Sequence, residues 1–445
     1  MSSFVVEVAE EELILKEVRY TQQISLHVSC LILVFLRYLK VGSKMKIFSV
    51  LRSFFQLEPS LLFVSFSNFL IWLSVYISYL YNSPFLVKLG ASATLLGAVY
   101  LIQNFISLLA YFLGGWMADF WDKKKLILLG WSAYVLSFFL LFISWNINVA
   151  LVAIVMASIS YIASPALFSF IANATSENNR GTVFGFLNAM NYSAATFGPI
   201  VATLIVSEEV TVKRIKLLYV CSLTISLLSL LVLAVFVGNS SSSKTSSRTS
   251  SSYKKNFEGF SKLLRKKVIL YYLITYFVLS QMSMVAPFTM VYMLDIIKSP
   301  AYIVNLSFSI TTLLGIPIVM LYGKLSDKLG RKALIIATHT ANAFLMLWFT
   351  CINNAYLLLV YAILKAFTDY SSPLLAFEAE LVNSDERGKL RGLLSVFKSL
   401  FSIPAPLIGG FLWSNISPRA PYYVVSLLEV LYILIFAFLV RRIQK

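Results

Sequence analysis

The chain has 445 residues, of which 59% are hydrophobic and only 13% are charged. Soluble domains carry about 25% charged residues, so this composition excludes an ordinary water-soluble globule. Apolar runs of about 20 residues, the length a helix needs to cross a bilayer, recur along the chain. The formal net charge is +17. We therefore predict an all-α membrane protein with a strong basic excess.

Twelve transmembrane helices are predicted in chain order. Their approximate ranges are 61–82, 93–113, 126–145, 148–170, 182–206, 215–237, 267–294, 301–322, 333–352, 355–378, 391–413 and 420–440. With these spans, 29 of the 37 Lys and Arg residues lie on the side that carries both termini, and 6 lie on the opposite side. Positive charge marks the cytoplasmic side of a membrane. We expect a multi-pass protein of the cell membrane with both termini cytoplasmic, and we assign the basic excess to anionic lipid, not to nucleic acid.

Four segments are expected along the chain. They are an N-terminal cytoplasmic or interfacial extension (1–57), a six-helix bundle (58–237), a Ser-rich cytoplasmic linker (238–262) and a second six-helix bundle (263–445). The apolar run in the extension is about 13 residues long, too short to span. The extension is either an appendage or the product of an upstream start that is not used. The linker composition cannot bury a core, which favours a flexible tether.

The two bundles share a repeat at a nearly constant offset. Asp119 and Pro165 in the first bundle correspond to Asp327 and Pro373 in the second, each 208 residues later. Repeated matches at one offset indicate duplication. Two six-helix units related by an axis along the membrane normal are the expected result.

Two loops with a similar layout belong to this repeat, "GGWMADFWDKKKLI" from residue 114 and "YGKLSDKLGRKALI" from residue 322. Each places Gly four residues before Asp and follows with a basic cluster; the first copy departs from the pattern at Phe120 and Asp122. Together with the twelve spans, this layout resembles the signature of the major facilitator superfamily over residues 58–440. The resemblance implies loops that latch one state of an alternating-access cycle, and an ordinary basic loop is the alternative. The candidate loop residues are Gly115, Asp119, Lys123, Lys124, Gly323, Asp327, Arg331 and Lys332.

The same resemblance implies that spans 1, 4, 7 and 10 line a central cavity. Polar and aromatic residues three or four apart place a stripe on one face of spans 1 and 7. Hydrogen bonding between packed helices is the competing role for such side chains. The candidate substrate-cavity residues are Asn68, Trp72, Tyr76, Tyr161, Asn191, Tyr276 and Gln281.

Three charged residues are singled out inside spans, Lys365 and Asp369 in span 10 and Lys398 in span 11. A charge in the bilayer is costly and usually faces a partner or water. At a rise of about 1.5 Å per residue, Asp369 and Lys398 lie at similar depth. We interpret Asp369 as the only acid near the midplane and as the coupling group, paired with one of the lysines. A static ion pair is the alternative.

Span 5 carries Gly185, Gly198 and Pro199 in an order similar to the glycine-proline signature of proton-driven drug exporters. Small residues let such a helix pack closely. The arginine that those exporters typically carry in span 4 is missing here.

We expect a secondary active transporter, with proton-coupled efflux of amphipathic or aromatic compounds as the leading function. Proton-coupled uptake of a small organic anion or nutrient is the alternative, and a non-transporting receptor or scaffold is the second. The chain lacks protease, hydrolase and phosphate-loop motifs, so no enzyme activity is expected. His27 and His339 are solitary and are expected to pack as ordinary residues. No cofactor, metal or nucleic acid is expected; the partners are a small-molecule substrate, a proton or other ion and the bilayer, around a monomer.

Overall fold

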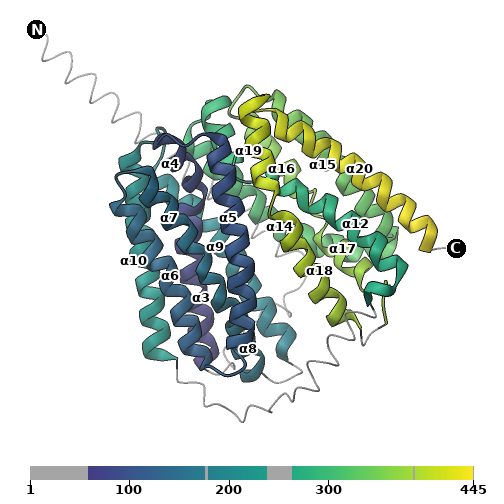
Figure 1. Ribbon diagram of the computed structural model, residues 1–445, viewed down its shortest axis with the longest axis horizontal. Helices are drawn as coiled ribbons and strands as arrows, with labels where there is room; N and C mark the ends of the chain where they lie inside the picture. Colours follow the sequence, from purple (N-terminus) through teal and green to yellow (C-terminus); the bar gives the residue numbers. More distant parts are fainter. Residues whose placement is uncertain (1–58, 176–178, 238–262, 384–385, 444–445) are drawn as a thin grey trace, which may run out of the picture. The chain divides into compact units, whose positions relative to one another are not determined.

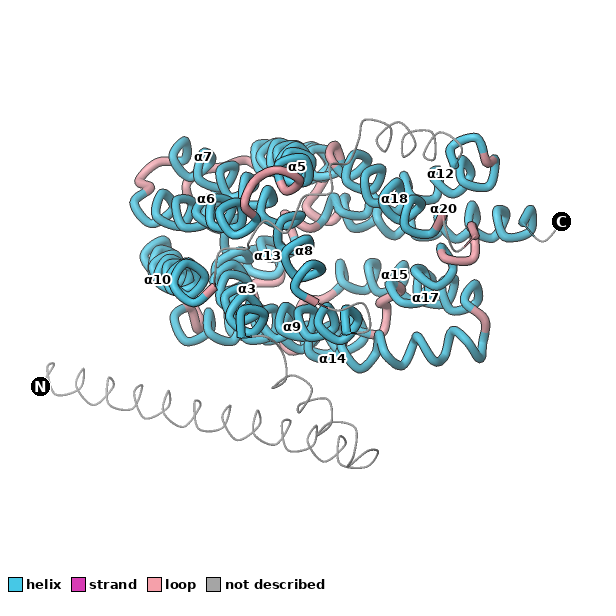
Figure 2. The backbone as a smooth tube through the Cα atoms, turned by 90° about the horizontal axis from the view of Figure 1, so that it is seen from below, coloured by secondary structure: helices cyan, strands magenta, loops and turns pink. Residues whose placement is uncertain are grey.

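The computed structural model describes residues 59–175, 179–237, 263–383 and 386–443. The described residues from Ser60 onward belong to one compact unit. The predicted extension (1–57) and linker (238–262) lie outside the described residues. Figure 2 shows helices, and no strand, in the described part of the chain.

Six spans form the first half, drawn in purple to teal in Figure 1. They are α3 (Pro59–Ser78) continued by η1 (Tyr79–Tyr81) and α4 (Asn82–Lys88), α5 (Ala93–Met117), α6 (Lys123–Ile143), α7 (Ile147–Ala157) continued by η2 (Ser158–Ile162) and α8 (Ala163–Ala174), α9 (Arg180–Ile205), and α10 (Val212–Phe236).

Six further spans form the second half, drawn in green to yellow in Figure 1. They are α12 (Lys267–Gln281) continued by η4 (Met282–Val285), α13 (Thr289–Val291) and the π-helical turn η5 (Tyr292–Ile296), α14 (Ala301–Leu329), α15 (Arg331–Cys351), α16 (Leu357–Ala366) with α17 (Ser371–Glu378), α18 (Arg387–Ser402) with α19 (Ala405–Asn415), and α20 (Ala420–Ile443).

Ten helical stretches in the described chain are long and apolar enough to cross a membrane. The remaining two spans are α9, which has 26 residues, and the broken pair α16 and α17. At about 1.5 Å per residue, α9 is also long enough to cross. The predicted all-α membrane fold is therefore confirmed, and the described helices can be grouped into the twelve predicted spans.

Spans 1, 4, 7 and 10, which were expected to be central, each contain a segment that is not regular α-helix. The interruptions are η1, η2, the stretch from η4 to η5, and residues 367–370. Irregular backbone at membrane depth is tolerated where it is buried in protein or lines a cavity, because lipid cannot satisfy its polar groups. Side chains satisfy two of these groups in span 10. The Tyr322 hydroxyl donates to the Phe367 carbonyl at 2.6 Å, and the Asp369 carboxylate accepts the Ser371 N–H at 2.8 Å.

The two halves pack closely through glycine. We call the side of the membrane that carries the two motif loops the linker side. The opposite side is the distal side, and it carries the loops between spans 1 and 2, 5 and 6, 7 and 8, and 11 and 12. Near the distal side α5 packs against α19, and a Cβ atom at Gly97 would lie 2.4 Å from the Pro406 carbonyl oxygen. A Cβ at Gly410 would lie 2.5 Å from the Ala93 carbonyl oxygen. Only glycine allows this approach.

Hydrogen bonds between α14 and the first half reinforce the same side. Asn305 is fully buried, and its Nδ2 donates to the Tyr81 hydroxyl at 2.8 Å and to Thr203 Oγ1 at 3.2 Å. The Tyr302 N–H donates to the Ser207 carbonyl at 2.7 Å. These contacts join the halves into a distal seal.

Candidate functional site

A cavity of about 610 Å³ lies within the second half. All six spans of that half contribute to its wall, and the wall is largely apolar. Apolar and aromatic members are Leu279, Met282, Val285, Met293, Phe308, Met346, Tyr361, Ala362, Tyr370 and Val425. Pockets of roughly 300–1,000 Å³ with few polar groups are typical of small-molecule sites.

Hydroxyl side chains in the wall mostly donate to the backbone of their own helices. Ser280 donates to the Tyr276 carbonyl at 2.7 Å, and Ser307 donates to the Ile303 carbonyl at 2.8 Å. The Thr289 hydroxyl donates to the Val285 carbonyl, one turn earlier in the same span, at 2.9 Å. The wall's remaining hydrogen-bond donors are its charged and amide groups and the hydroxyls of Ser399, Tyr361 and Tyr370.

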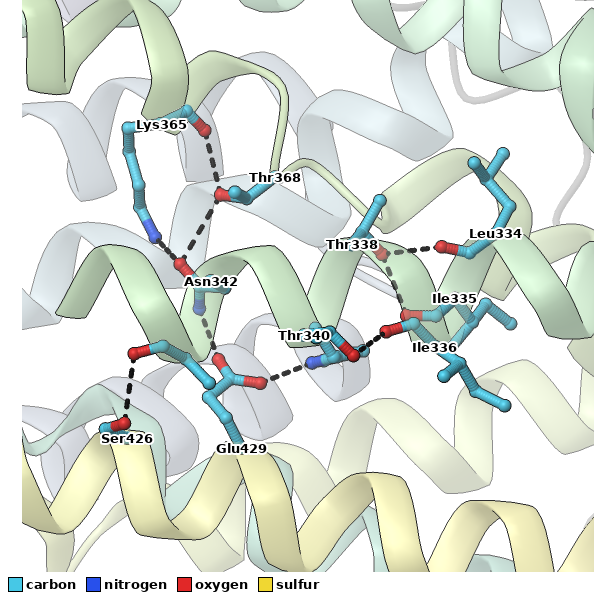
Figure 3. A network of polar contacts seen from close by, with 12 residues as sticks. Leu334, Ile335, Ile336, Thr338, Thr340, Asn342, Lys365, Thr368, Ser426 and Glu429 are labelled. Atoms are coloured by element: carbon cyan, nitrogen blue, oxygen red, sulfur yellow. Dashed lines mark hydrogen bonds and ion pairs between the residues drawn. The ribbon is translucent and has the colours of Figure 1, made fainter. Parts of the chain in front are cut away.

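The charged residues of the wall are Lys365, Lys398 and Glu429. Glu429 of α20 is fully buried, and its Oε2 lies 2.5 Å from Nδ1 of His339 on α15. Its Oε1 accepts a hydrogen bond from Asn342 Nδ2, and Asn342 Oδ1 accepts one from Lys365 Nζ. Figure 3 shows Asn342 between the lysine and the carboxylate. The network therefore links spans 9, 10 and 12.

Aromatic rings enclose the histidine of this network. The His339 ring stacks on Tyr370 at a centroid distance of 4.2 Å and lies tilted against the Tyr432 ring at 4.1 Å. Its Nε2 is buried and has no hydrogen-bond partner among the described residues. A buried charge without partners is very costly. The contacts with His339 and Asn342 therefore make burial of the Glu429 carboxylate tolerable.

Two expectations are wrong at this site. Asp369 is not the only acid deep in the spans, since Glu429 lies near the centre of the apolar run 420–440. His339 is not an isolated packing residue, because it pairs with that acid. An acidic residue in the middle of a predicted span was a signal that the sequence did contain. The partner was not visible because it lies 90 residues away in the chain.

The predicted pairing of Asp369 with a lysine is also wrong. Lys365 and Lys398 both line the cavity, whereas Asp369 does not. Within the described chain, no ion pair within 4.0 Å joins Asp369 to a lysine. The helix ends at Ala366, so the i, i+4 spacing to Lys365 does not place the two groups on one helical face. A coupling role for these three residues stays a prediction.

Predicted cavity residues of the first half are partly engaged in helix contacts. Asn68 is buried and donates to Asn191 Oδ1 at 2.8 Å, which joins spans 1 and 5. The rings of Trp72 and Tyr76 lie 5.9 Å apart on one face of α3. Tyr161 is 38% exposed. None of these five residues lines the 610 Å³ cavity.

The two predicted cavity residues of the second half also lie outside its wall. Tyr276 donates to Glu378 Oε1 at 2.5 Å, and Gln281 donates to the Phe401 carbonyl at 2.7 Å. Their neighbours Ser280, Met282 and Ser283 line the cavity instead. Because α12 ends at Gln281 and continues as a 3-10 turn, helical periodicity does not identify the inward face here.

The first motif loop is held inside its own half. Lys124 is 9% exposed, and its Nζ donates to the Ala234 and Val237 carbonyls at 2.9 and 2.5 Å, which caps the end of α10. Asp122, which replaces the second glycine of the pattern, is the N-cap of α6 and accepts the Lys125 N–H at 2.9 Å. The other candidates are the exposed Asp119, the half-buried Lys123 and Gly115, beside which a Cβ would meet open space.

Arg331 of the second motif loop forms its ion pairs within the second half. Arg331 lies 2.6 Å from Glu380 and 3.7 Å from Asp327, all within the second half. Gly330 has a φ of +88°, which explains why glycine separates α14 from α15. A Cβ at Gly323 would lie 3.3 Å from Ser372 Oγ, and Lys332 is half-buried. The latch role of both loops stays a prediction.

Span 5 packs closely at one of its two predicted glycines. A Cβ at Gly198 would lie 2.5 Å from the Tyr76 Cβ, whereas a Cβ at Gly185 would meet open space. Pro199 lies inside α9 next to this close contact.

Comparisons with known proteins agree with this fold. The family model of the Major Facilitator Superfamily matches residues 62–368 and 291–445. Multidrug resistance protein 2 of Bacillus subtilis is 24% identical over 335 residues, covering 73% of this chain and 80% of that protein. An uncharacterised MFS-type transporter of Methanocaldococcus jannaschii is 27% identical over 153 residues, and the match covers 32% of this chain and only 38% of that protein. The crystal structure of nucleoside transporter NupG superimposes with a TM-score of 0.70 at 16% identity, covering 85% of this chain and 98% of that one.

Proposed function

This chain belongs to the major facilitator superfamily, and on that premise we propose that it is a proton-coupled secondary transporter of small amphipathic organic solutes. The cavity of the second half is the solute site, and Glu429 is the group that binds and releases the proton. One observation carries the proposal: the buried carboxylate of Glu429 is connected to the cavity lysine Lys365 through Asn342.

The network has the properties that coupling requires. A carboxylate in low dielectric stays ionised only while donors and a cation compensate its charge. Here His339 and Asn342 hold the two oxygens, and Lys365 supplies the positive charge. These groups come from three different spans, so a rearrangement of span 10 against spans 9 and 12 removes compensation and favours the protonated acid.

The conformation supports an alternating-access cycle. The distal seal through Gly97 and Asn305 closes one side of the bundle. On the linker side, Lys124 and Arg331 of the two motif loops each bond to groups of their own half. If the basic residues orient the chain as expected, the sealed side faces outward and the termini are cytoplasmic.

Two directions of transport have support. Efflux is supported by the name of the Bacillus subtilis relative, which is a multidrug resistance protein. Uptake of an organic anion together with a proton is supported by the two lysines of the cavity wall, Lys365 and Lys398. Transport by vesicles of known orientation, with the pH gradient imposed in either sense, separates these two.

The test of coupling is transport by purified protein in liposomes, with and without a pH gradient. Naphthalenesulfonate and a naphthylmethyl-trimethylammonium salt serve as probes because their charges do not change with pH. We expect the gradient to drive accumulation of at least one probe, and Glu429→Gln to abolish that response. Asp369→Asn is the matched comparison. In the described structure the Asp369 carboxylate accepts a hydrogen bond only from the Ser371 N–H, and the amide oxygen of asparagine can accept the same bond. If Glu429→Gln still responds to the gradient, Glu429 is not the coupling acid; if only Asp369→Asn loses the response, the sequence-based assignment is correct.

A further inference from the structure

The cavity of the second half has an asymmetric charge. Its charged wall residues are two lysines and one acid, and both oxygens of that acid are occupied by His339 and Asn342. With Glu429 ionised, the wall residues alone therefore have a formal charge of +1; Asp369 and Glu378 lie outside the wall and act electrostatically on Lys365 and Lys398, respectively. An anionic group entering the cavity meets net attraction, and a cationic group meets net repulsion.

Lys398 is the cation that is available to a ligand. Its side chain is exposed and lines the cavity, and within the described chain it makes no hydrogen bond or ion pair. Glu378 is within electrostatic range of Lys398, but its Oε1 already accepts the hydroxyls of Tyr272 and Tyr276. Lys365 has three N–H donors, and one of them is used by Asn342.

Three hydroxyl side chains of the wall are poor donors for a sugar-like ligand. Ser280, Ser307 and Thr289 spend their hydroxyl protons on backbone carbonyls. They can accept hydrogen bonds but cannot donate them without losing the existing ones. Methionine and aromatic side chains supply most of the remaining surface, with Met282, Phe308 and Met346 among them. Such surfaces adapt to flat or branched apolar groups of different shapes.

We propose that the solute is an organic monoanion, with its acidic group bound by Lys398 and Lys365 and its apolar body held against the methionine and aromatic wall. This inference rests on the cavity being the solute site of the proposed function, and it adds the sign of the charge. The volume of about 610 Å³ admits a ligand of drug-like size.

The test is ligand binding to the purified full-length chain in detergent, at one pH and without any gradient. Three probes share a naphthalene body: naphthalenesulfonate, naphthalenemethanol and naphthylmethyl-trimethylammonium. We expect the anion to raise the thermal unfolding temperature at the lowest concentration, the alcohol to require at least tenfold more, and the cation to have no effect. Lys398→Gln should weaken anion binding about tenfold or more, since charge-assisted hydrogen bonds contribute roughly 1.5–3 kcal/mol.

Matched variants separate a specific site from a general charge effect. Lys389→Gln removes the same charge from the same helix, α18, at a residue that does not line the cavity, and should leave binding unchanged. Lys398→Arg should retain the anion preference, and Ser399→Asp should weaken anion binding and permit the cation. The inference is overturned if the anion does not bind, if the alcohol or the cation binds as tightly, or if Lys398→Gln keeps wild-type anion affinity. The binding test uses no gradient, so its result does not depend on whether Glu429→Gln loses coupling in the transport test. If the pH gradient drives transport of the cationic probe, that result contradicts the anion inference and leaves the proposed proton-coupled transport standing.

Discussion

Nδ1 of His339 lies 2.5 Å from Oε2 of Glu429, and both side chains are fully buried between α15 and α20. The two residues are 90 positions apart in the chain. Within the membrane-spanning part, this contact turns two residues that are each costly to bury into one compensated unit. It also fixes α15 against α20 beside the cavity.

Replacing His339 should therefore destabilise the protein strongly. His339→Leu leaves a buried carboxylate without one of its partners, and breaking a buried pair in this way costs about 3–5 kcal/mol. Glu429→Gln should cost much less, since an amide has nearly the same shape and can still bond to both neighbours. Thermal unfolding in detergent measures the difference. A His339→Leu protein as stable as the wild type would show that the acid is not ionised in this state.

Gly198 and Gly185 lie on the same helix and should respond in opposite ways to an added methyl group. A Cβ at Gly198 would lie 2.5 Å from the Tyr76 Cβ and 2.8 Å from the Tyr76 backbone carbon, so Gly198→Ala forces spans 1 and 5 apart. Overpacking of this kind costs about 1–3 kcal/mol. Gly185→Ala meets open space and should be neutral or slightly stabilising. Equal unfolding temperatures for the two variants would contradict the close packing.

The distal seal should open when Gly97 acquires a side chain. Gly97→Ala places a methyl group 2.4 Å from the Pro406 carbonyl oxygen, which the backbone cannot absorb without moving α5 from α19. We expect a higher labelling rate of a cysteine at Thr94, which donates to Ser414 in the seal, by a membrane-impermeant maleimide. Gly115→Ala on the same helix meets open space and is the control. Unchanged labelling in Gly97→Ala would show that the seal does not depend on this contact.

Adjacent lysines of the first motif loop should differ in their effect on stability. Lys124 donates to two carbonyls at the end of α10, where a positive charge also interacts favourably with the helix dipole. Lys124→Gln should lower the free energy of unfolding by about 1–2 kcal/mol. Lys125 is exposed. Lys125→Gln should therefore change the free energy of unfolding by less than about 0.5 kcal/mol. Chemical denaturation of both variants in detergent gives the comparison, and equal losses would refute the capping role.

Asp122 stands where the family pattern of the motif loop has its second glycine. In the second half, Gly330 makes the turn between α14 and α15 with a positive φ. In the first half, Asp122 makes the equivalent turn by capping α6, with an ordinary φ of −61°. The departure from the family pattern is therefore a second solution to the same backbone problem. Aspartate at a helix N-cap is a local preference, and sequence alone supports it.

The amino-acid sequence by itself determined the helical class, the approximate ranges of the apolar helices and the position of the basic motif loops. Each of these depends on local composition or on periodicity along one helix, which a linear sequence retains. The cavity and the Glu429 network were decided only by the tertiary structure. Their residues come from different spans, and the helix breaks near Gln281 and Ala366 change which side chains face inward. Helical periodicity ends where a helix ends, so a face read from residue spacing could not place Gln281 or Asp369, and no local pattern joins His339 to Glu429.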